Sequence, residues 1–336
     1  MHEDVYPLTF EPEFRDYIWG GRRLETLFGR QLPEGIVAES WDISGHPTSP
    51  TRVESGKWKG RTLPEVMEAM GTDLVGSNSR AMLTRGRFPL LVKLLDANDD
   101  LSVQVHPDDE YAAAHEGGEL GKTEMWYVLY AEPGTELIYG LARGATRRSL
   151  RRAIENGTLE EQLHRVTIAP GDCFYVPAGT VHALPAGAVV AEIQQNSDTT
   201  YRVHDWGRVG ADGRPRPLHV DKALDVIDWS QIEPGRTEPR LLYEGEGVRR
   251  SLLVDGEKFT AEQITLADGA AFNGRCTGAT FEIWGCIGGA GEIAWEGAPL
   301  ALNAVRFALL PAVLGDFGVR SRGTSAWLRV YVDRQD

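Results

Sequence analysis

The stretch PGDCFYVPAGTVHAL, residues 170–184, carries the most informative strand-and-turn pattern of this chain. It opens with a Pro-Gly-Asp turn, continues as a short alternating segment, turns again at Pro-Ala-Gly and reaches His182. Alternating runs of four to eight residues between Gly and Pro turns are typical of strands. The stretch therefore predicts two strands joined by a tight turn, with a histidine at the start of the second strand.

The same pattern continues along the first half of the chain. Without alternating helix signals, so many short strands favour an antiparallel β-barrel or jelly roll, hence a mainly β fold. Helical spacing interrupts them at residues 63–75, 80–84, 146–162 (broken at Gly157) and 218–229. The further strand segments are PLLVKLLDA (89–97), LSVQVHP (101–107), MWYVLYA (125–131), ELIYGLA (136–142), AVVAEIQQ (188–195) and TTYRVHDW (199–206).

A length of 336 residues indicates roughly two domains. We expect a domain over residues 1–230 with helical insertions, a linker at 231–240, and a β-sandwich over 241–336, where the strand pattern resumes at Leu241. All eight histidines precede residue 220, so an imidazole metal site must lie in the first domain and the second must be free of one. A distant duplication of the two β units has no repeated string to support it.

Composition excludes several classes of function. The net charge of −14 disfavours nucleic acid and anionic lipid as partners, and a phosphorylated substrate would need a local basic patch. The N-terminus has no signal-peptide pattern, and no run of 18 apolar residues exists. Three cysteines without C-x-x-C spacing form neither a disulfide framework nor a zinc knuckle. We expect a soluble cytoplasmic protein.

Three segments carry side chains that suit a metal. Gln104 and His106 are two residues apart on a predicted strand, so they share a face about 6.6 Å apart. Lys122 and Glu124 have the same spacing, and His182 follows the Pro-Ala-Gly turn. Two imidazoles, a carboxylate and an amide oxygen are ligands for a zinc-like ion that keeps an open position. Considered one at a time, each histidine is more often a structural residue than a metal ligand.

Residues 170–184 closely resemble the second motif of the cupins, a family of metal-binding β-barrels. The full set of motifs closely resembles the short bacterial form of type I mannose-6-phosphate isomerase over residues 7–229, and the remainder resembles that family's metal-free second domain, a cupin-like β unit, in length and strand pattern. The matching strings are WGG (19–21) with Leu24, ESW (39–41) with Ser44, LLVKLLDA (90–97), LSVQVHPDD (101–109), GKTEMWYVL (121–129), VPAGTVHAL (176–184), TTYRVHDWGR (199–208) and RPLHVDKAL (216–224).

The resemblance implies one zinc ion per chain and a reaction that interconverts mannose 6-phosphate and fructose 6-phosphate. It implies that Arg202 is catalytic and that Lys93 and Lys122 line the pocket. It also implies that the zinc ligands are Gln104, His106, Glu124 and His182.

Chemistry from the residues agrees with that assignment. Isomerisation moves a proton between C1 and C2, and zinc near O1 and O2 would stabilise an enediolate. Lys122 is a candidate base if zinc and partial burial favour its neutral form; His204 or a metal-bound water are alternatives. Arg202 suits charge stabilisation, a grip on phosphate, or an ion pair with Asp198 or Asp205.

The substrate contacts are less defined, because no glycine-rich phosphate loop is present. The cations near the motifs are Lys93, Lys122, Arg202, Arg208 and Arg216. Lys93 and Arg208 are candidate substrate contacts, and Trp19 either shapes the cavity or packs in the core.

Two other classes of function stay open. A further cupin enzyme could isomerise a different sugar, or use His106, Glu124 and His182 as the iron-binding face of an oxygenase. A non-catalytic sugar-binding cupin would be expected to carry a broken ligand set, whereas this set is intact. The oligomeric state is left open by the sequence.

Overall fold

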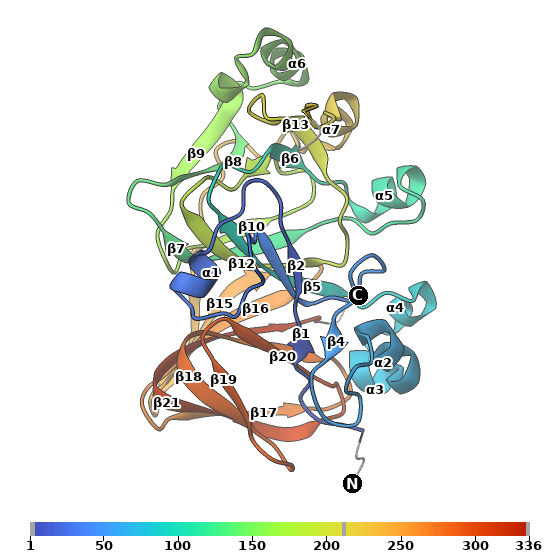
Figure 1. The fold of residues 1–336 in the computed structure, drawn as a ribbon, viewed down its shortest axis with the longest axis vertical. Helices are drawn as coiled ribbons and strands as arrows, with labels where there is room; N and C mark the ends of the chain where they lie inside the picture. Colours follow the sequence, from blue (N-terminus) through green and yellow to red (C-terminus); the bar gives the residue numbers. More distant parts are fainter. Residues whose placement is uncertain (1–3, 210–212, 334–336) are drawn as a thin grey trace. The chain divides into compact units, whose positions relative to one another are not determined.

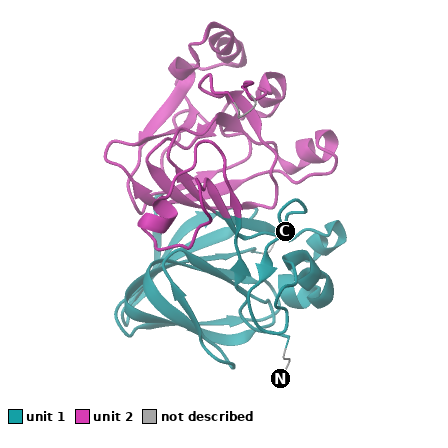
Figure 2. Cartoon of the chain, viewed as in Figure 1, with its two compact units in different colours: residues 1–13, 41–93, 237–336 teal, residues 14–40, 94–236 magenta. Residues whose placement is uncertain are grey.

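The computed structural model describes residues 4–209 and 213–333, and the chain divides into two compact units. Unit 1 comprises residues 1–13, 41–93 and 237–336, and unit 2 comprises residues 14–40 and 94–236 (Figure 2). One crossing point lies between Arg236 and Thr237, and the domain bounds expected from the sequence stay a prediction. Residues 1–13 and 41–93, however, group with the C-terminal strands rather than with the rest of the first domain.

Unit 2 contains a five-stranded antiparallel sheet with the order β13-β6-β11-β8-β9, of which β13, β6, β8 and β9 are labelled in Figure 1. A second sheet has the order β10-β7-β12-β5-β3-β2, of which β7, β10 and β12 lie wholly in unit 2. The strands are β2 (Glu13–Arg15), β3 (Glu39–Ile43), β5 (Leu90–Ala97), β6 (Val103–Val105), β7 (Glu124–Ala131), β8 (Glu136–Leu141), β9 (Leu163–Thr167), β10 (Cys173–Val176), β11 (His182–Ala183), β12 (Ala188–Gln195) and β13 (Tyr201–His204).

Strands of both sheets contribute to a buried core in unit 2, as expected for a jelly-roll barrel. Trp126 of β7, Phe174 of β10 and Tyr139 of β8 belong to one hydrophobic cluster, and the last two rings meet edge to face at 5.3 Å. Side chains alternate between the two faces of a strand, so β6 and β13 also carry residues that face away from this core. Those residues pack in a second cluster beneath the helices α6 and α7. The predicted mainly β architecture is confirmed.

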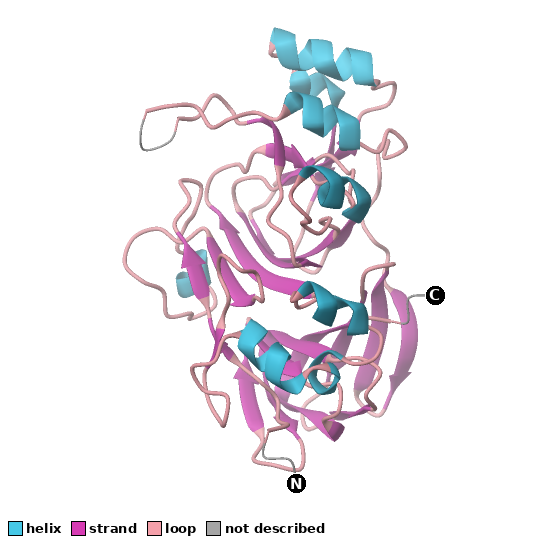
Figure 3. Ribbon diagram, turned by 90° about the vertical axis from the view of Figure 1, so that its right-hand side faces the viewer, coloured by secondary structure: helices cyan, strands magenta, loops and turns pink. Residues whose placement is uncertain are grey.

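Helices are few and short (Figure 3). Thr62 and Glu65 form a capping box at the start of α2, and Gly71 separates α2 from α3. The predicted break at Gly157 is present too, where φ is +73° and α6 ends. The helices are α1 (Arg23–Thr26), α2 (Leu63–Met70), α3 (Thr72–Val75), α4 (Arg80–Arg85), α5 (Asp109–His115), α6 (Arg147–Asn156), α7 (Val220–Val226) and the 3-10 turn η1 (Leu159–Gln162).

Unit 1 is built on an eight-stranded sheet with the order β14-β15-β16-β21-β18-β19, to which β17 adds at β21 and β20 at β18. Trp284 and Trp327 lie at the centre of its core. The strands are β14 (Arg240–Gly245), β15 (Val248–Asp255), β16 (Thr260–Leu266), β17 (Ala271–Cys276), β18 (Glu282–Ala294), β19 (Leu300–Asn303), β20 (Arg306–Leu310), β21 (Gly315–Tyr331) and the separate pair β1 (Phe10–Glu11) and β4 (Arg52–Val53).

Two further expectations concern the whole chain. In the described residues, no helix is long and apolar enough to cross a membrane. Cys173, Cys276 and Cys286 are all free and buried, as the spacing of the cysteines predicts.

Candidate metal centre

The candidate ligands are brought together at the ends of three strands of unit 2. His106 directly follows β6, Glu124 begins β7 and His182 begins β11. The backbone N–H of Gly179 donates to the carbonyl of His106 at 2.9 Å, which ties the Pro-Ala-Gly turn to the first histidine. Gly179 has a φ of +88°, a conformation in which a side chain would be strained. The turn therefore places both histidines.

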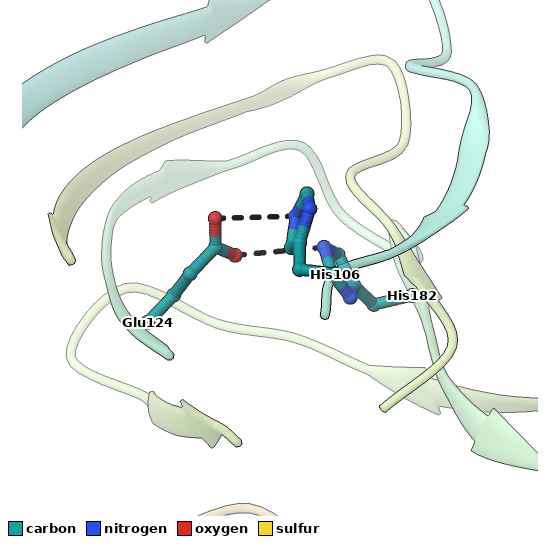
Figure 4. Close-up of side chains that lie close together, drawn as sticks. All are labelled: His106, Glu124 and His182. Atoms are coloured by element: carbon teal, nitrogen blue, oxygen red, sulfur yellow. Dashed lines mark ion pairs between the residues drawn. The ribbon is translucent and has the colours of Figure 1, made fainter. Parts of the chain in front are cut away.

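His106, Glu124 and His182 form a compact, buried cluster (Figure 4). Nε2 of His106 lies 3.4 Å from Oε1 of Glu124, and Nε2 of His182 lies 3.5 Å from Oε2. The centroids of the imidazole rings are 4.9 Å apart. One carboxylate thus faces two ring nitrogens at distances longer than normal hydrogen bonds.

The hydrogen bonds of the other ring nitrogens define the protonation of the cluster. Nδ1 of His106 lies 2.8 Å from the carbonyl of Thr199, and Nδ1 of His182 lies 2.9 Å from that of Thr180. A carbonyl only accepts, so each Nδ1 carries the proton and each Nε2 presents a lone pair. Burial, followed by the charge of Lys122, lowers the pKa of His106 to about 3. Burial also lowers the pKa of His182, so both rings are neutral at neutral pH.

Lone pairs and a negative charge therefore converge in a volume closed to solvent. Nζ of Lys122 lies 2.7 Å from Oε1 of Glu124 and 3.4 Å from Nε2 of His106. Burial alone would raise the pKa of Glu124, but Lys122 and the imidazoles hold it well below its ordinary value. Two neutral imidazoles and a carboxylate, all of them acceptors, are the donor set of a divalent metal. The residues present fit such an ion.

Gln104 extends the cluster across the sheet. It lies opposite His182 in the β6–β11 pair and opposite Arg202 in the β6–β13 pair. Directly opposed residues share a face, so these three side chains form one row on the face that bears the cluster. The amide nitrogen of Gln104 is 3.4 Å from Nε2 of His182, and a half-turn of the amide would present its oxygen instead.

Arg202 follows the alternation of its strand. Its neighbours Tyr201 and Val203 are buried in the cluster under the helices, so Arg202 faces the opposite side. Its Nη1 donates to the carbonyl of Pro217 at 3.1 Å, while its buried Nε has no partner. In the described part of the chain no ion pair joins Arg202 to Asp198 or Asp205.

Asp205 is instead shared by two other arginines. Nη2 of Arg208 lies 2.7 Å from Oδ1 of Asp205, and Nε of Arg216 lies 2.7 Å from Oδ2. Arg208 is thus committed to a structural ion pair in this state. Together the two arginines hold the pKa of Asp205 below its ordinary value, although burial opposes them.

The remaining candidate residues, Trp19, Lys93 and His204, lie in three different local environments. Trp19 is buried in the core cluster that contains Trp126. Lys93 is buried in the part of β5 that belongs to unit 1, with its ammonium 4.4 Å from the ring centroid of Trp41. His204 lies on β13 with its ring edge-on to Trp206 at 5.0 Å.

The sequence interpretation missed the polar residues at the end of β12. Glu192 accepts from the indole N–H of Trp126 at 2.9 Å, and Gln194 lies opposite Glu124 in the β7–β12 pair. Gln195 accepts from the backbone N–H of Thr123 at 3.0 Å. The signal was present: AVVAEIQQ reads as a buried strand, yet its last four residues include three with long polar side chains.

Comparisons with known proteins agree on one family. Residues 8–127 match the family model described as the phosphomannose isomerase type I catalytic domain. The chain is 40% identical to the probable mannose-6-phosphate isomerase GmuF of Bacillus subtilis, covering 94% of this chain and 96% of that protein. It is 46% identical to the mannose-6-phosphate isomerase ManA of the same organism, over 69% and 71% of the two chains.

Solved structures give the same result. The crystal structure of the mannose 6-phosphate isomerase from Bacillus subtilis superposes with a TM-score of 0.86 at 36% identity, covering 96% of this chain and 99% of that chain. A putative mannosephosphate isomerase from Archaeoglobus fulgidus, at 20% identity and a TM-score of 0.76, shares the fold; 98% of this chain and 99% of that chain are covered.

Proposed function

Because the chain belongs to the type I phosphomannose isomerase family, we propose that it is a zinc-dependent enzyme that interconverts mannose 6-phosphate and fructose 6-phosphate. The activities for which these relatives are named support the reaction, and the cluster of His106, Glu124 and His182 supports the metal. We assign Gln104 as the fourth ligand from its place in the row beside His182.

The observation that carries the proposal is the convergence of acceptors in the cluster. Two Nε2 lone pairs face a carboxylate inside the barrel, and the Lys122 ammonium forms an ion pair with that carboxylate. When bound there, zinc would supply a Lewis acid for the oxygens on C1 and C2 of the sugar. The carbonyls of Thr199 and Thr180 hold both imidazoles in the tautomer that a ligand needs.

The reaction needs a group that carries a proton between two carbons. From the open-chain form of mannose 6-phosphate, a base removes the proton on C2, and the hydrogen of the O2 hydroxyl is transferred to O1. Returning the carried proton to C1 then gives fructose 6-phosphate, so atoms balance. We assign this role to Lys122, because its Nζ lies beside two candidate ligands and is closed to bulk water. It would act as the neutral amine, since a zinc ion held by the same ligands would repel the ammonium form. His204, on the strand that carries Arg202, is the alternative base.

Arg202 is assigned to the charge that develops on the sugar oxygens. It shares a row with Gln104 and His182, and its buried Nε has no protein partner to satisfy it. A guanidinium is permanently charged and donates in a planar fork, which suits an enediolate or a phosphate. Lys93, Trp19 and Arg208 stay predicted substrate contacts, Arg208 only if it leaves Asp205.

The substrate is a small sugar phosphate, and neither nucleic acid nor membrane is proposed as a partner. The net charge of −14 supports that view, and sugar phosphate chemistry supports a cytoplasmic location. The competing functions differ in metal and in substrate. An oxygenase would use iron at the same two histidines and carboxylate, whereas a binding protein would hold the sugar without turnover.

The test combines metal analysis with a coupled assay in both directions. We expect about one zinc per chain, turnover of mannose 6-phosphate and fructose 6-phosphate, loss of turnover on chelation, and its return when zinc is added back. Turnover that survives complete removal of the metal would overturn the metal role. Metal-loaded protein that fails to convert either sugar phosphate would overturn the reaction.

A further inference from the structure

Gln194 lies beside the metal cluster and has no role in the function proposed above. It belongs to β12 and lies directly opposite Glu124 in the β7–β12 pair, so the two side chains share a face. The side chain is completely buried. It therefore borders the candidate site from the sheet that carries Glu124, opposite the row formed by Gln104, His182 and Arg202.

The hydrogen bonds of Gln194 define the orientation of its amide. Nε2 donates to the carbonyl of Gln195 at 2.7 Å and to the carbonyl of Ser197 at 2.6 Å. Both amide protons are used, and a flipped amide would turn its oxygen toward two carbonyl oxygens. The oxygen Oε1 is therefore held away from those carbonyls.

That oxygen is buried and has no hydrogen-bond partner in the described structure. An unpaired buried acceptor costs about 1–3 kcal/mol, so native proteins pair nearly all of them. The neighbouring Gln195 shows the ordinary arrangement, because its Oε1 accepts from Thr123 and its Nε2 donates to Asp109. Gln194 differs from Gln195 at Oε1: in Gln195 this atom accepts a backbone N–H, whereas in Gln194 it has no partner in the described structure.

The groups of the cluster are committed to one another. Glu124 is an acceptor, the Nε2 atoms of His106 and His182 present lone pairs, and the Lys122 ammonium forms an ion pair with Glu124 and contacts His106. A donor brought by a ligand would satisfy Oε1 of Gln194. A sugar held at the metal brings hydroxyl groups, which donate to an amide oxygen.

We propose that Oε1 of Gln194 accepts a hydrogen bond from a substrate hydroxyl near the reacting carbons, which makes Gln194 a specificity-determining residue. The inference rests on the proposed isomerase function. A site built to pair a hydroxyl discriminates strongly against an analogue that lacks it. Gln194 would thus select sugars by the presence and direction of that hydroxyl.

The test replaces Gln194→Met, which keeps the length and removes the acceptor, and compares it with Gln195→Met. Binding of an alditol 6-phosphate, a reduced sugar that cannot isomerise, is measured by calorimetry beside kcat and KM. We expect the Kd of the alditol to rise by about tenfold or more in Gln194→Met, with kcat/KM falling in step and metal content unchanged. Folded Gln195→Met should keep its Kd within about twofold.

A second variant and an analogue make the outcome decisive. Gln194→Asn withdraws the same amide by one methylene, and should weaken binding as well if Gln194→Met fails to fold. One monodeoxy alditol phosphate should bind wild type and Gln194→Met equally, since the missing hydroxyl is the contact. Unchanged Kd and KM in a folded, metal-loaded variant of an active wild type would overturn the Gln194 assignment alone. A metal-loaded wild type without turnover would overturn the proposed function.

Discussion

Gln104 and His182, 78 residues apart in the sequence, are direct partners across the β6–β11 pair, with the amide nitrogen of Gln104 3.4 Å from Nε2 of His182. The ladder sets this pairing, and a shift of one residue would turn one of the two side chains to the helix-covered face. Val105 and Ala183, the next residues along, lie in that outer cluster. Barrel register therefore assembles the candidate ligands.

The first prediction concerns metal occupancy. His106→Ala or His182→Ala should lower the metal content from about one zinc per chain to below roughly one tenth, and turnover should vanish with it, because each removes a lone pair that no neighbour replaces. Elemental analysis of the purified variants measures this. His164→Ala, on the edge strand β9 of the same sheet, is the matched control and should keep its metal. Full occupancy in both site variants would contradict the assignment.

The second prediction concerns acid stability of the metal-free protein. Because burial lowers the pKa of His106 to about 3, this ring stays neutral in the fold at pH 5 but is protonated in the unfolded chain, whose value is about 6.5. Unfolding then takes up protons, so stability is complete above about pH 6.5 and falls toward pH 3. We expect a loss of about 2 kcal/mol from His106 between pH 7 and pH 5.

Urea unfolding at the two pH values tests this slope. His106→Gln cannot take up the proton and should lose much less stability on acidification, although His182 keeps its own contribution of the same sign. His164→Gln should behave like the wild type. An equally steep fall in His106→Gln would show that other groups cause the acid sensitivity.

The sequence predicted the site because local rules apply at its positions. His106 and Gln104 share a strand face by spacing alone, and the Pro-Ala-Gly turn ahead of His182 has the positive φ that its glycine permits. Alternation along the strand likewise turns Arg202 away from Tyr201 and Val203, which pack in the cluster under the helices. Which role each residue plays stays a prediction.

Other features depend on contacts that local patterns do not encode. Residues 41–93 group with the C-terminal strands because of their packing, although they precede most of the first domain in sequence. The short helix α5 was missed, since its seven residues include only one that is buried, and its signal is the cap at Asp108. The importance of Gln194 depends on its register with Glu124, which only the sheet reveals.

The third prediction separates stability from chemistry in unit 1. Arg329 of β21 donates to Glu282 through Nε at 2.8 Å and lies 3.3 Å from Glu262, and all three are largely buried. Removing one partner of a buried ion network leaves unpaired charge, so Arg329→Met should cost about 3–5 kcal/mol. Arg275→Met, which breaks an exposed pair with Asp316, should cost about 0.5 kcal/mol or less.

Both variants should keep the metal content and kcat of the folded protein, because we expect the C-terminal strands to supply no catalytic group. Urea unfolding measures the first effect, and the coupled assay measures the second. A hundredfold fall in kcat for folded Arg275→Met would refute the expectation.

The last prediction concerns Arg202. Its row partner Gln104 borders His182, and its buried Nε lacks a partner, so its guanidinium is available to the sugar rather than to a carboxylate. If Arg202 stabilises charge that develops only during the reaction, its loss lowers kcat and leaves KM nearly unchanged. If it instead binds the phosphate equally well in the ground state and in the transition state, its loss raises KM. We expect the first pattern.

Arg202→Lys keeps the charge but removes the planar fork. Turnover should fall by roughly two orders of magnitude, about 2.7 kcal/mol, while the metal stays bound because arginine is not a ligand. Arg165→Lys, on β9 of the same sheet and paired with Glu160, controls for the exchange of an arginine and should keep its kcat. Steady-state kinetics of metal-loaded enzyme decide the matter. Near-normal turnover of Arg202→Lys would contradict the prediction. In the described residues Arg202 forms no ion pair with Asp198 or Asp205, so its role would then be structural, through its hydrogen bond to the carbonyl of Pro217.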